Sequence, residues 1–349
     1  MHFAFTDQQL EFRDAVRQVL AKECTTDHVR AAYDAPAPRT VRWATLADLG
    51  VTGLAVPESR GGLGLGLVDL VLLVEEAGRV ALPEPLADTS GVAAPLLVDL
   101  DAIGVGGART GPWLEGIASG TTTVAVADVR RPGAPTAGAV GADLLLLVAH
   151  GEHGPVLHGV DATAATVTPV PSLDPTRRLG SAAWEPSSAS VLASGPVAGD
   201  LLDRSSDRAA VVTGAELLGL ADAMITRTSS YAKDRQQFGR PIGSFQAVKH
   251  LLAGAQVLLE FARPVVYGAA WALDSGSPDG SRSASVAKAY ASEAAVEAAR
   301  VSLQVHGAIG YTWECDLHLF LKRAWALSEA WGSAGDHRSR LLDSLLAGR

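Results

Sequence analysis

The spacing of apolar residues predicts helices through the first third of the chain. Thr6 followed by Gln9 is a capping-box signature, and the apolar positions after it recur on one helical face. That face is made by Leu10, Val16, Val19 and Leu20. Further helices are expected over 41–50 and 67–80. The segment 51–66 between them contains GGLGLG but follows no strand, so it is predicted to be a loop rather than a dinucleotide fingerprint.

From about Thr121 to Ala198 the pattern changes to short β-rich runs separated by Gly and Pro. The runs are TTTVAVADV, ADLLLLVAH and PVLHGVD. They predict a small antiparallel sheet or barrel. His150 and His153 fall in the HGEHG turn, which we interpret as a solvated hairpin turn rather than a metal site, because no further ligand stands at suitable spacing.

Helical periodicity then returns and continues to the end of the chain. Four long helices are predicted, over Asp207–Lys233, Ser244–Leu273, Ser281–His306 and Asp316–Ala330. They are expected to form an antiparallel bundle, and Pro264 should interrupt and kink the second helix. The order of elements predicts an α+β protein of three domains: a helical domain over 1–119, a shortened β-domain over 120–200 and a helical bundle over 201–349.

Composition narrows the class of protein. The formal net charge of -9 and an isoelectric point near 5.5 provide no basic surface, so nucleic-acid binding is not expected. Cys24 and Cys315 are too few for a disulfide framework or a zinc site, which suggests a reducing, cytoplasmic location. The chain shows no signal-peptide pattern, and apolar runs such as 144–149 are too short to span a bilayer.

The segment 231–252, YAKDRQQFGRPIGSFQAVKHLL, carries the clearest candidate chemistry. The Arg235 guanidinium offers planar, bidentate donors that suit a pyrophosphate. Phe238-Gly239 lets a ring approach a backbone that carries no side chain. Gln237 and Gln246 add amide groups. Together these groups predict a site for a phosphate and a ring.

This segment resembles the part of flavin-dependent acyl-CoA dehydrogenases that reaches across a subunit interface to FAD. A second match lies over 304–314, QVHGAIGYTWE, which resembles the glutamine-and-double-glycine loop of that family, with Ala308 where the second glycine usually stands. The resemblance implies that a partner's FAD is contacted by Arg235, Gln237, Phe238 and Gln246. It also implies that the pyrophosphate or adenosine end is held by Gln304, Gly307 and Ala308.

The family reaction removes a proton from Cα of an acyl-CoA while a hydride leaves Cβ for the flavin, so a carboxylate base is needed near Cα. At the two positions where relatives carry that glutamate, this chain has Trp331 and Ala209. No catalytic residue is therefore assigned. The nearest carboxylates, Asp207, Glu216 and Glu329, are expected to be helix-surface or cap residues, with Glu216 the best substitute.

The middle region also departs from the family. Between Thr121 and Pro186 it lacks the Thr-Glu-Pro and Gly-Ser-Asp signature that lies against the flavin ring in relatives. The resemblance therefore implies the non-catalytic subunit of a heteromeric enzyme, similar to the paired short and full-length subunits of actinobacterial steroid side-chain oxidation. It further implies an acyl-CoA substrate, a full-length partner subunit and an electron-transfer flavoprotein as acceptor.

Three alternatives stay open from the sequence. The chain can be a self-sufficient homo-oligomeric dehydrogenase with Glu216 as base, a flavin monooxygenase or oxidase of the same superfamily, or a flavin-free subunit that only dimerises. His306 has two interpretations, as a phosphate donor or as a helix C-terminal group favoured by the dipole. Three tryptophans are expected to pack in the core or at a subunit interface: Trp313, Trp325 and Trp331.

Overall fold

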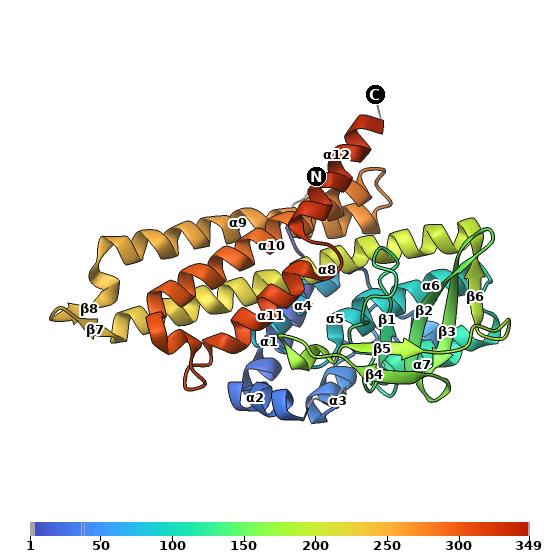
Figure 1. Ribbon diagram of the computed structural model, residues 1–349, viewed down its shortest axis with the longest axis horizontal. Helices are drawn as coiled ribbons and strands as arrows, with labels where there is room; N and C mark the ends of the chain where they lie inside the picture. The colour runs from blue at the N-terminus through green and yellow to red at the C-terminus, as the bar shows by residue number, and fades with distance from the viewer. Residues whose placement is uncertain (1–3, 36, 38, 348–349) are drawn as a thin grey trace.

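The computed structural model describes residues 4–35, 37 and 39–347, and its N-terminal part is helical as predicted (Figure 1). The helices are α1 (Asp7–Glu23), α2 (Thr26–Asp34), α3 (Val41–Asp48), α4 (Leu67–Arg79), α5 (Leu86–Asp88), α6 (Ala94–Ala102) and α7 (Thr110–Ala118). The capping box at α1 is confirmed: the Gln9 amide donates to the Thr6 hydroxyl, and the Thr6 amide donates to the Gln9 side chain. The GGLGLG segment is a loop before α4, also as predicted.

The middle region forms a sheet of order β1-β2-β3-β6 and a separate pair β4-β5. The strands are β1 (Val124–Val126), β2 (Leu144–Gly151), β3 (Gly154–Asp161), β4 (Thr166–Pro169), β5 (Gly180–Ala183) and β6 (Val191–Ser194). The expectation of a purely antiparallel sheet was wrong, because β1 and β2 are parallel. The connection 127–143 is long enough to return the chain to the end at which β1 began, as a parallel pair requires.

Helices α8 (Gly195–Asp234), α9 (Gln246–Asp274), α10 (Gly280–His306) and α11 (Leu317–Glu329) form the predicted bundle, and α12 (Ala334–Ala347) follows. Helix α8 begins at Gly195, before the predicted Asp207, because its first turns bury Ala198 and Leu201 against the sheet. The interruption expected in the second bundle helix was also wrong. Helix α9 continues through Pro264, which is exposed, so the carbonyl that lacks an amide partner can be hydrated.

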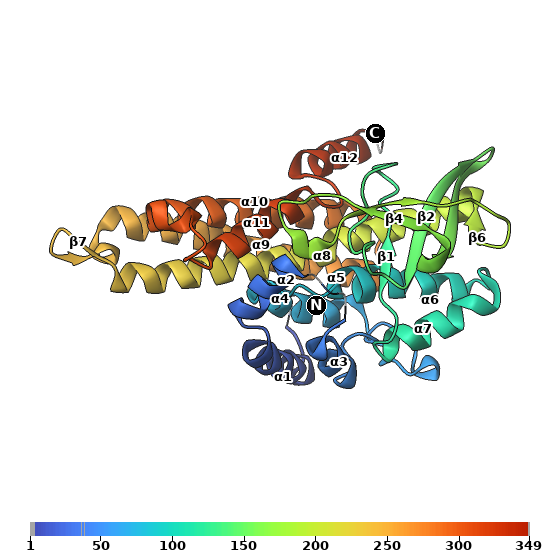
Figure 2. The same ribbon diagram turned by 60° about the horizontal axis from the view of Figure 1, so that its bottom comes forward.

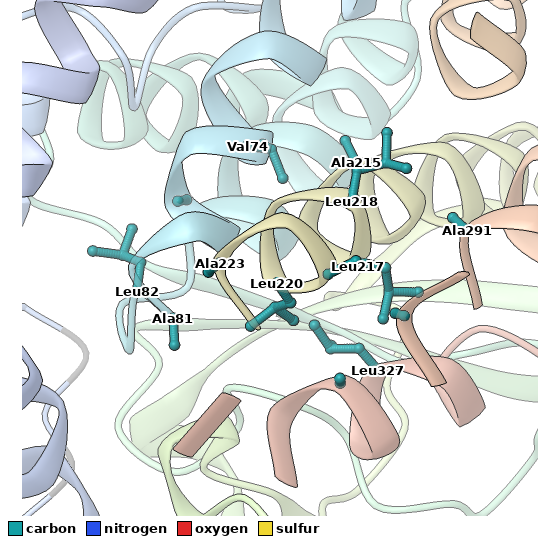
Figure 3. Close-up of a cluster of buried hydrophobic side chains, with 14 of the residues drawn as sticks. Val74, Ala81, Leu82, Ala215, Leu217, Leu218, Leu220, Ala223, Ala291 and Leu327 are labelled. Atoms are coloured by element: carbon teal, nitrogen blue, oxygen red, sulfur yellow. The ribbon is translucent and has the colours of Figure 1, made fainter. Parts of the chain in front are cut away.

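One large apolar core joins the N-terminal helices to the bundle. Figure 3 shows Val74 of α4, Leu217 and Leu218 of α8 and Leu327 of α11 within it. Helices α4 and α8 cross so closely that a Cβ at Gly219 would lie 1.9 Å from the Glu75 carbonyl oxygen. This close crossing brings the middle of α8 against the N-terminal helices.

Helix α8 is the one described helix long and apolar enough to cross a membrane. Its apolar window is 89% buried inside the protein, as in the core helix of a globular protein. In Figure 2 the N-terminal helices lie on one side of α8, and the other bundle helices lie along it. Its apolar surface is therefore accounted for by packing within the chain.

Candidate functional site

The first predicted motif forms the tip of the bundle, where α8 ends and α9 begins (Figure 1). Between them the chain makes a two-stranded hairpin, β7 (Gln236–Gln237) with β8 (Arg240–Pro241). Phe238 and Gly239 form its turn with φ of 55° and 77°, and two positive φ values are what a tight hairpin turn of this kind requires. The Ile242 amide donates to the Arg235 carbonyl at 2.8 Å and closes the hairpin.

The hairpin presents its polar groups outward. Arg235, Gln237 and Gln246 are exposed, and none of their side chains makes a hydrogen bond within the described ranges. The Phe238 side chain is 91% exposed and meets the Phe245 ring edge-on at 6.1 Å. An exposed phenyl ring and unused charged donors point away from this chain, which suits contact with a second molecule.

The second motif lies at the end of α10. Gln304, Gly307 and Ala308 are exposed, and Gly307 has a φ of 66°. The rings of Tyr231 and His306 stack with centroids 4.2 Å apart and planes 16° from parallel. This stack ties the end of α10 to the last turns of α8, so the structure brings the two motifs to one end of the bundle.

His306 is a neutral group in this arrangement. Its Nδ1 lies 2.8 Å from the Ser302 carbonyl, to which it donates, and burial lowers the pKa of the imidazole. A neutral ring does not supply the positive charge on which the helix-dipole interpretation depended. The ring instead packs against Tyr231.

The backbone at both motifs leaves room for a bound group. A Cβ at Gly239 or at Gly307 would meet no atom of this chain within 4 Å, and both residues have a positive φ. Arg235 and Gln237, on the same hairpin as Gly239, are exposed. A guanidinium, amides and open backbone are the donor set that a pyrophosphate and a ring require, so these residues fit the FAD that the resemblance implies.

At the two positions where relatives carry the base, this chain has side chains that pack in an apolar cluster. Trp331 lies between α11 and α12 with a φ of 56°, is half-buried and packs against the core cluster beside the sheet. Ala209 is fully buried in the same cluster. Neither side chain can accept a proton.

Glu216 is buried in an ion-pair network, so the expectation of a helix-surface or cap carboxylate was wrong. Its Oε1 accepts from Arg323 Nε at 2.7 Å. The Arg323 guanidinium also donates to Asp174 at 3.3 Å and to the Thr176 hydroxyl at 2.9 Å. Burial raises the pKa of Glu216, and the Arg323 charge opposes that shift. The partners lie far apart in sequence, so no local pattern signals this network.

The cavity beside Glu216 has a volume of about 30 Å³, close to the space of one water molecule. Its wall includes Asp88, Arg177 and Arg178 as well as Glu216 and Arg323. A space of this size, lined by these charged side chains, does not admit an acyl chain. Glu216 therefore has the surroundings of a structural anchor.

The other two candidate carboxylates differ from one another. Asp207 is also buried, contrary to expectation, and accepts from Arg340 at 2.5 Å and from Arg130 at 3.3 Å. Glu329 is exposed, as predicted. Both arginines donate to the same oxygen of Asp207, Oδ1, and so tie this carboxylate to the loop after β1 and to α12.

Two larger cavities flank Trp331, with volumes of about 210 and 300 Å³. Asp128 and Arg131 line both of them with Trp331. Burial raises the pKa of Asp128, and Arg131 donates to Asp336 at 3.2 Å. Sequence reasoning missed these residues, because the loop after β1 carries no motif.

The remaining predictions concern the histidine turn and the tryptophans. His150 and His153 lie at the tight turn that joins β2 to β3, as expected. No group of three potential metal ligands occurs among the residues that the structure describes. Trp325 packs against the large core and Trp331 against the smaller one, whereas Trp313 is 59% exposed beside His318.

Comparison with known proteins identifies the family. Residues 6–99 match the acyl-CoA dehydrogenase N-terminal domain, and residues 204–346 match the acyl-CoA dehydrogenase C-terminal domain. The chain is 35% identical over 332 residues to acyl-CoA dehydrogenase IpdE2 of Mycolicibacterium smegmatis, covering 94% of this chain and 96% of that protein. The chain belongs to the acyl-CoA dehydrogenase family. Its members are FAD-dependent oxidoreductases, and the α, β, α architecture found here is theirs.

Solved structures agree with this assignment. A variant of the Tcur3481-Tcur3483 steroid ACAD superposes with a TM-score of 0.87 at 30% identity, covering 98% of each chain. The ChsE4-ChsE5 complex from Mycobacterium tuberculosis superposes with a TM-score of 0.85 at 23% identity, covering 99% of each chain. The first likeness supports the family, and the second supports the fold.

Proposed function

We propose that this acyl-CoA dehydrogenase is the subunit of a hetero-oligomer that completes the FAD site of a partner and does not supply the catalytic base. The observation that carries the proposal is the pair of side chains at the base positions, an indole at Trp331 and a methyl group at Ala209. The reaction needs a proton acceptor beside Cα of the thioester. In the proposed complex the partner subunit supplies this base.

Each residue at the tip of the bundle has a part in this proposal. Arg235 binds the FAD pyrophosphate with two parallel donors, Gln237 and Gln246 add amide contacts, and the Phe238 ring covers an apolar part of the cofactor. Gln304 with the Gly307-Ala308 backbone holds its pyrophosphate or adenosine end. FAD, when bound, accepts the hydride from Cβ of the acyl group.

The same proposal extends to the partners. Two similar structures are named for pairs of proteins, Tcur3481-Tcur3483 and ChsE4-ChsE5. By analogy, a full-length acyl-CoA dehydrogenase is the partner of this chain, an acyl-CoA is the substrate and an electron-transfer flavoprotein is the acceptor. We assign the complex to the cytoplasm and to the oxidation of lipids or steroid side chains. We also retain the predicted domain boundaries at 119/120 and 200/201.

The alternative of a self-sufficient enzyme rests on Glu216, whose carboxyl is buried with a raised pKa, as a general base would be. Its surroundings speak against that role, because Arg323 occupies its oxygen and the adjoining cavity has room for about one water. Glu216→Gln tests it. If Glu216 is a base, turnover falls by several orders of magnitude at unchanged folded protein; if it is an anchor, turnover per folded complex is preserved.

The central experiment is co-purification of the chain with its partner from the native host, followed by the mass and flavin content of the complex. The proposal expects acyl-CoA oxidation by the complex and none by this chain alone. Turnover by the purified single chain, with bleaching of its own flavin, would overturn the proposal.

Arg235→Ala then tests the contact with FAD, with Arg300→Ala as control. Arg300 is also an exposed arginine, but its guanidinium pairs with Glu297 on the same helix. Losing one charged contact worth about 1.5 to 3 kcal/mol weakens FAD binding roughly ten- to hundredfold in an assembled complex. Unchanged flavin content in Arg235→Ala would instead support a subunit that only dimerises.

A further inference from the structure

The turn between α11 and α12 holds Trp331 in an uncommon backbone conformation. Trp331 and Gly332 have φ of 56° and 99°, a region that costs a tryptophan free energy unless its surroundings fix it there. Trp331 is a lining residue of all three cavities described above, of about 30, 210 and 300 Å³. A movement of this one indole therefore changes the shape of all three.

Lys288 of α10 reaches this turn from the core of the bundle. Its side chain is fully buried, and its Nζ donates to the Ser292 hydroxyl at 3.0 Å, the Ser328 carbonyl at 2.9 Å and the Gly332 carbonyl at 3.0 Å. An ammonium group has three donors, and all three are used. Two of the acceptors are backbone carbonyls that bracket Trp331.

Burying the charge of Lys288 costs free energy. It makes no salt bridge within the part of the chain that the structure describes, and burial lowers its pKa to about 7. An apolar side chain of similar length would fill the same space without that cost. The favourable contribution comes from the end of α11, where unpaired carbonyls and the negative end of the helix dipole attract a cation.

A second donor completes the attachment. His337 Nε2 lies 2.9 Å from the carbonyl of Trp331, and this buried ring donates to it. The carbonyls of Ser328, Trp331 and Gly332 are thus all held by side chains of other helices, Lys288 from α10 and His337 from α12. Without these donors the three carbonyls would lose their side-chain partners on α10 and α12, and the Trp331 side chain would keep only its hydrogen bond to Asp88.

We propose that Lys288 is a positioning residue that fixes the turn 328–333, so that the Trp331 indole stays in place as the shared wall of the three cavities. Lys288 thereby sets the width of the space beside the position where relatives carry the base. The proposal rests on the proposed function only in interpreting that space as the surroundings of the missing base. Its test requires neither flavin nor partner, so its failure is distinct from a failure of the proposed function.

The test uses the full chain labelled with 5-fluorotryptophan. The chain has seven tryptophans, and the resonance of Trp331 is assigned by its loss in Trp331→Phe. At about pH 6, where the Lys288 amine keeps its proton, we expect the Trp331 resonance of Lys288→Met to shift and broaden while the other tryptophan resonances remain. We also expect amide hydrogen exchange in 328–333 to accelerate by at least about tenfold, because charged hydrogen bonds to the turn are lost.

Two controls separate positioning from packing. Ser292→Ala removes one acceptor but leaves both carbonyl contacts, so its turn should exchange as in the wild type. Val301 of the same helix α10 is fully buried in the apolar core, so Val301→Ala should destabilise the packing of the bundle. It should not affect the Trp331 resonance more than the other tryptophan resonances.

Lys288→Gln keeps the proposal testable if Lys288→Met does not fold, because its shorter amide is polar but does not reach both carbonyls. Wild-type exchange in 328–333 with an unmoved Trp331 resonance, in either Lys288 variant, overturns the proposal. Acceleration spread evenly over the bundle helices overturns it as well.

Discussion

Removing the Arg323 guanidinium tests whether Glu216 is a structural anchor. In Arg323→Met the carboxylates of Glu216 and Asp174 lose donors at 2.7 and 3.3 Å, and both remain buried. Breaking a buried ion pair from one side costs about 3 to 5 kcal/mol. We therefore expect a loss of stability of that size.

Adding Glu216→Leu to Arg323→Met should restore part of the loss, because the second change removes the unpaired charge. We expect a coupling free energy of about 1 to 3 kcal/mol between the two positions. The matched control is Arg300→Met, which breaks an exposed pair with Glu297 and should change stability by less than about 1 kcal/mol. Urea and thermal unfolding are measured on the wild type, the single variants Arg323→Met and Glu216→Leu, the double variant and the control Arg300→Met.

The pH dependence of the stability of Arg323→Met provides a second, independent test. Without the guanidinium, burial and the nearby carboxylates of Asp88 and Asp174 act unopposed on Glu216 and raise its folded-state pKa further above the unfolded value. Stability from such a group is present below the unfolded pKa and lost as the pH rises, so the variant should be less impaired at low pH. A loss below about 1 kcal/mol, or additive effects of the two substitutions, would refute this account of the network.

Three further outcomes follow from the packing and the titratable groups. Gly219→Ala forces a Cβ to 1.9 Å from a backbone oxygen and should lower the free energy of unfolding by more than about 3 kcal/mol. The control Gly254→Ala lies on an open face of α9 and should raise the free energy of unfolding by about 0.5 to 1 kcal/mol. Equal effects of the two substitutions in urea unfolding would contradict the close helix crossing. The lowered pKa of Lys288, about 7, makes wild-type stability rise between pH 7 and 10 by up to about 1.4 kcal/mol per unit, and Lys288→Met should lose that slope. A thiol reagent should modify Cys315 in the native chain but Cys24 only after unfolding, since Cys24 is buried and its pKa is raised to about 12; mass spectrometry of the labelled peptides shows whether the order is reversed.

Local signals determined most of the secondary structure and the family. The capping box at Thr6, the helical periodicity of α9 to α11 and the Gly-rich loop before α4 each depend on neighbours within a few residues, and each lies where the sequence predicted it. The two motifs at the tip of the bundle could be found for the same reason. Their residue types and order express a local requirement, a hairpin turn with positive φ and donors that point outward.

The tertiary structure alone decided which carboxylates are buried and what surrounds them. The sequence showed an indole at 331, but only the fold places Lys288 under its turn and Arg323 against Glu216. The parallel pairing of β1 with β2 likewise depends on the path of a long connection. The physical reason is common to all three: charge burial and strand direction arise from contacts between segments distant in sequence, and the energy of such contacts leaves no periodic trace along the chain.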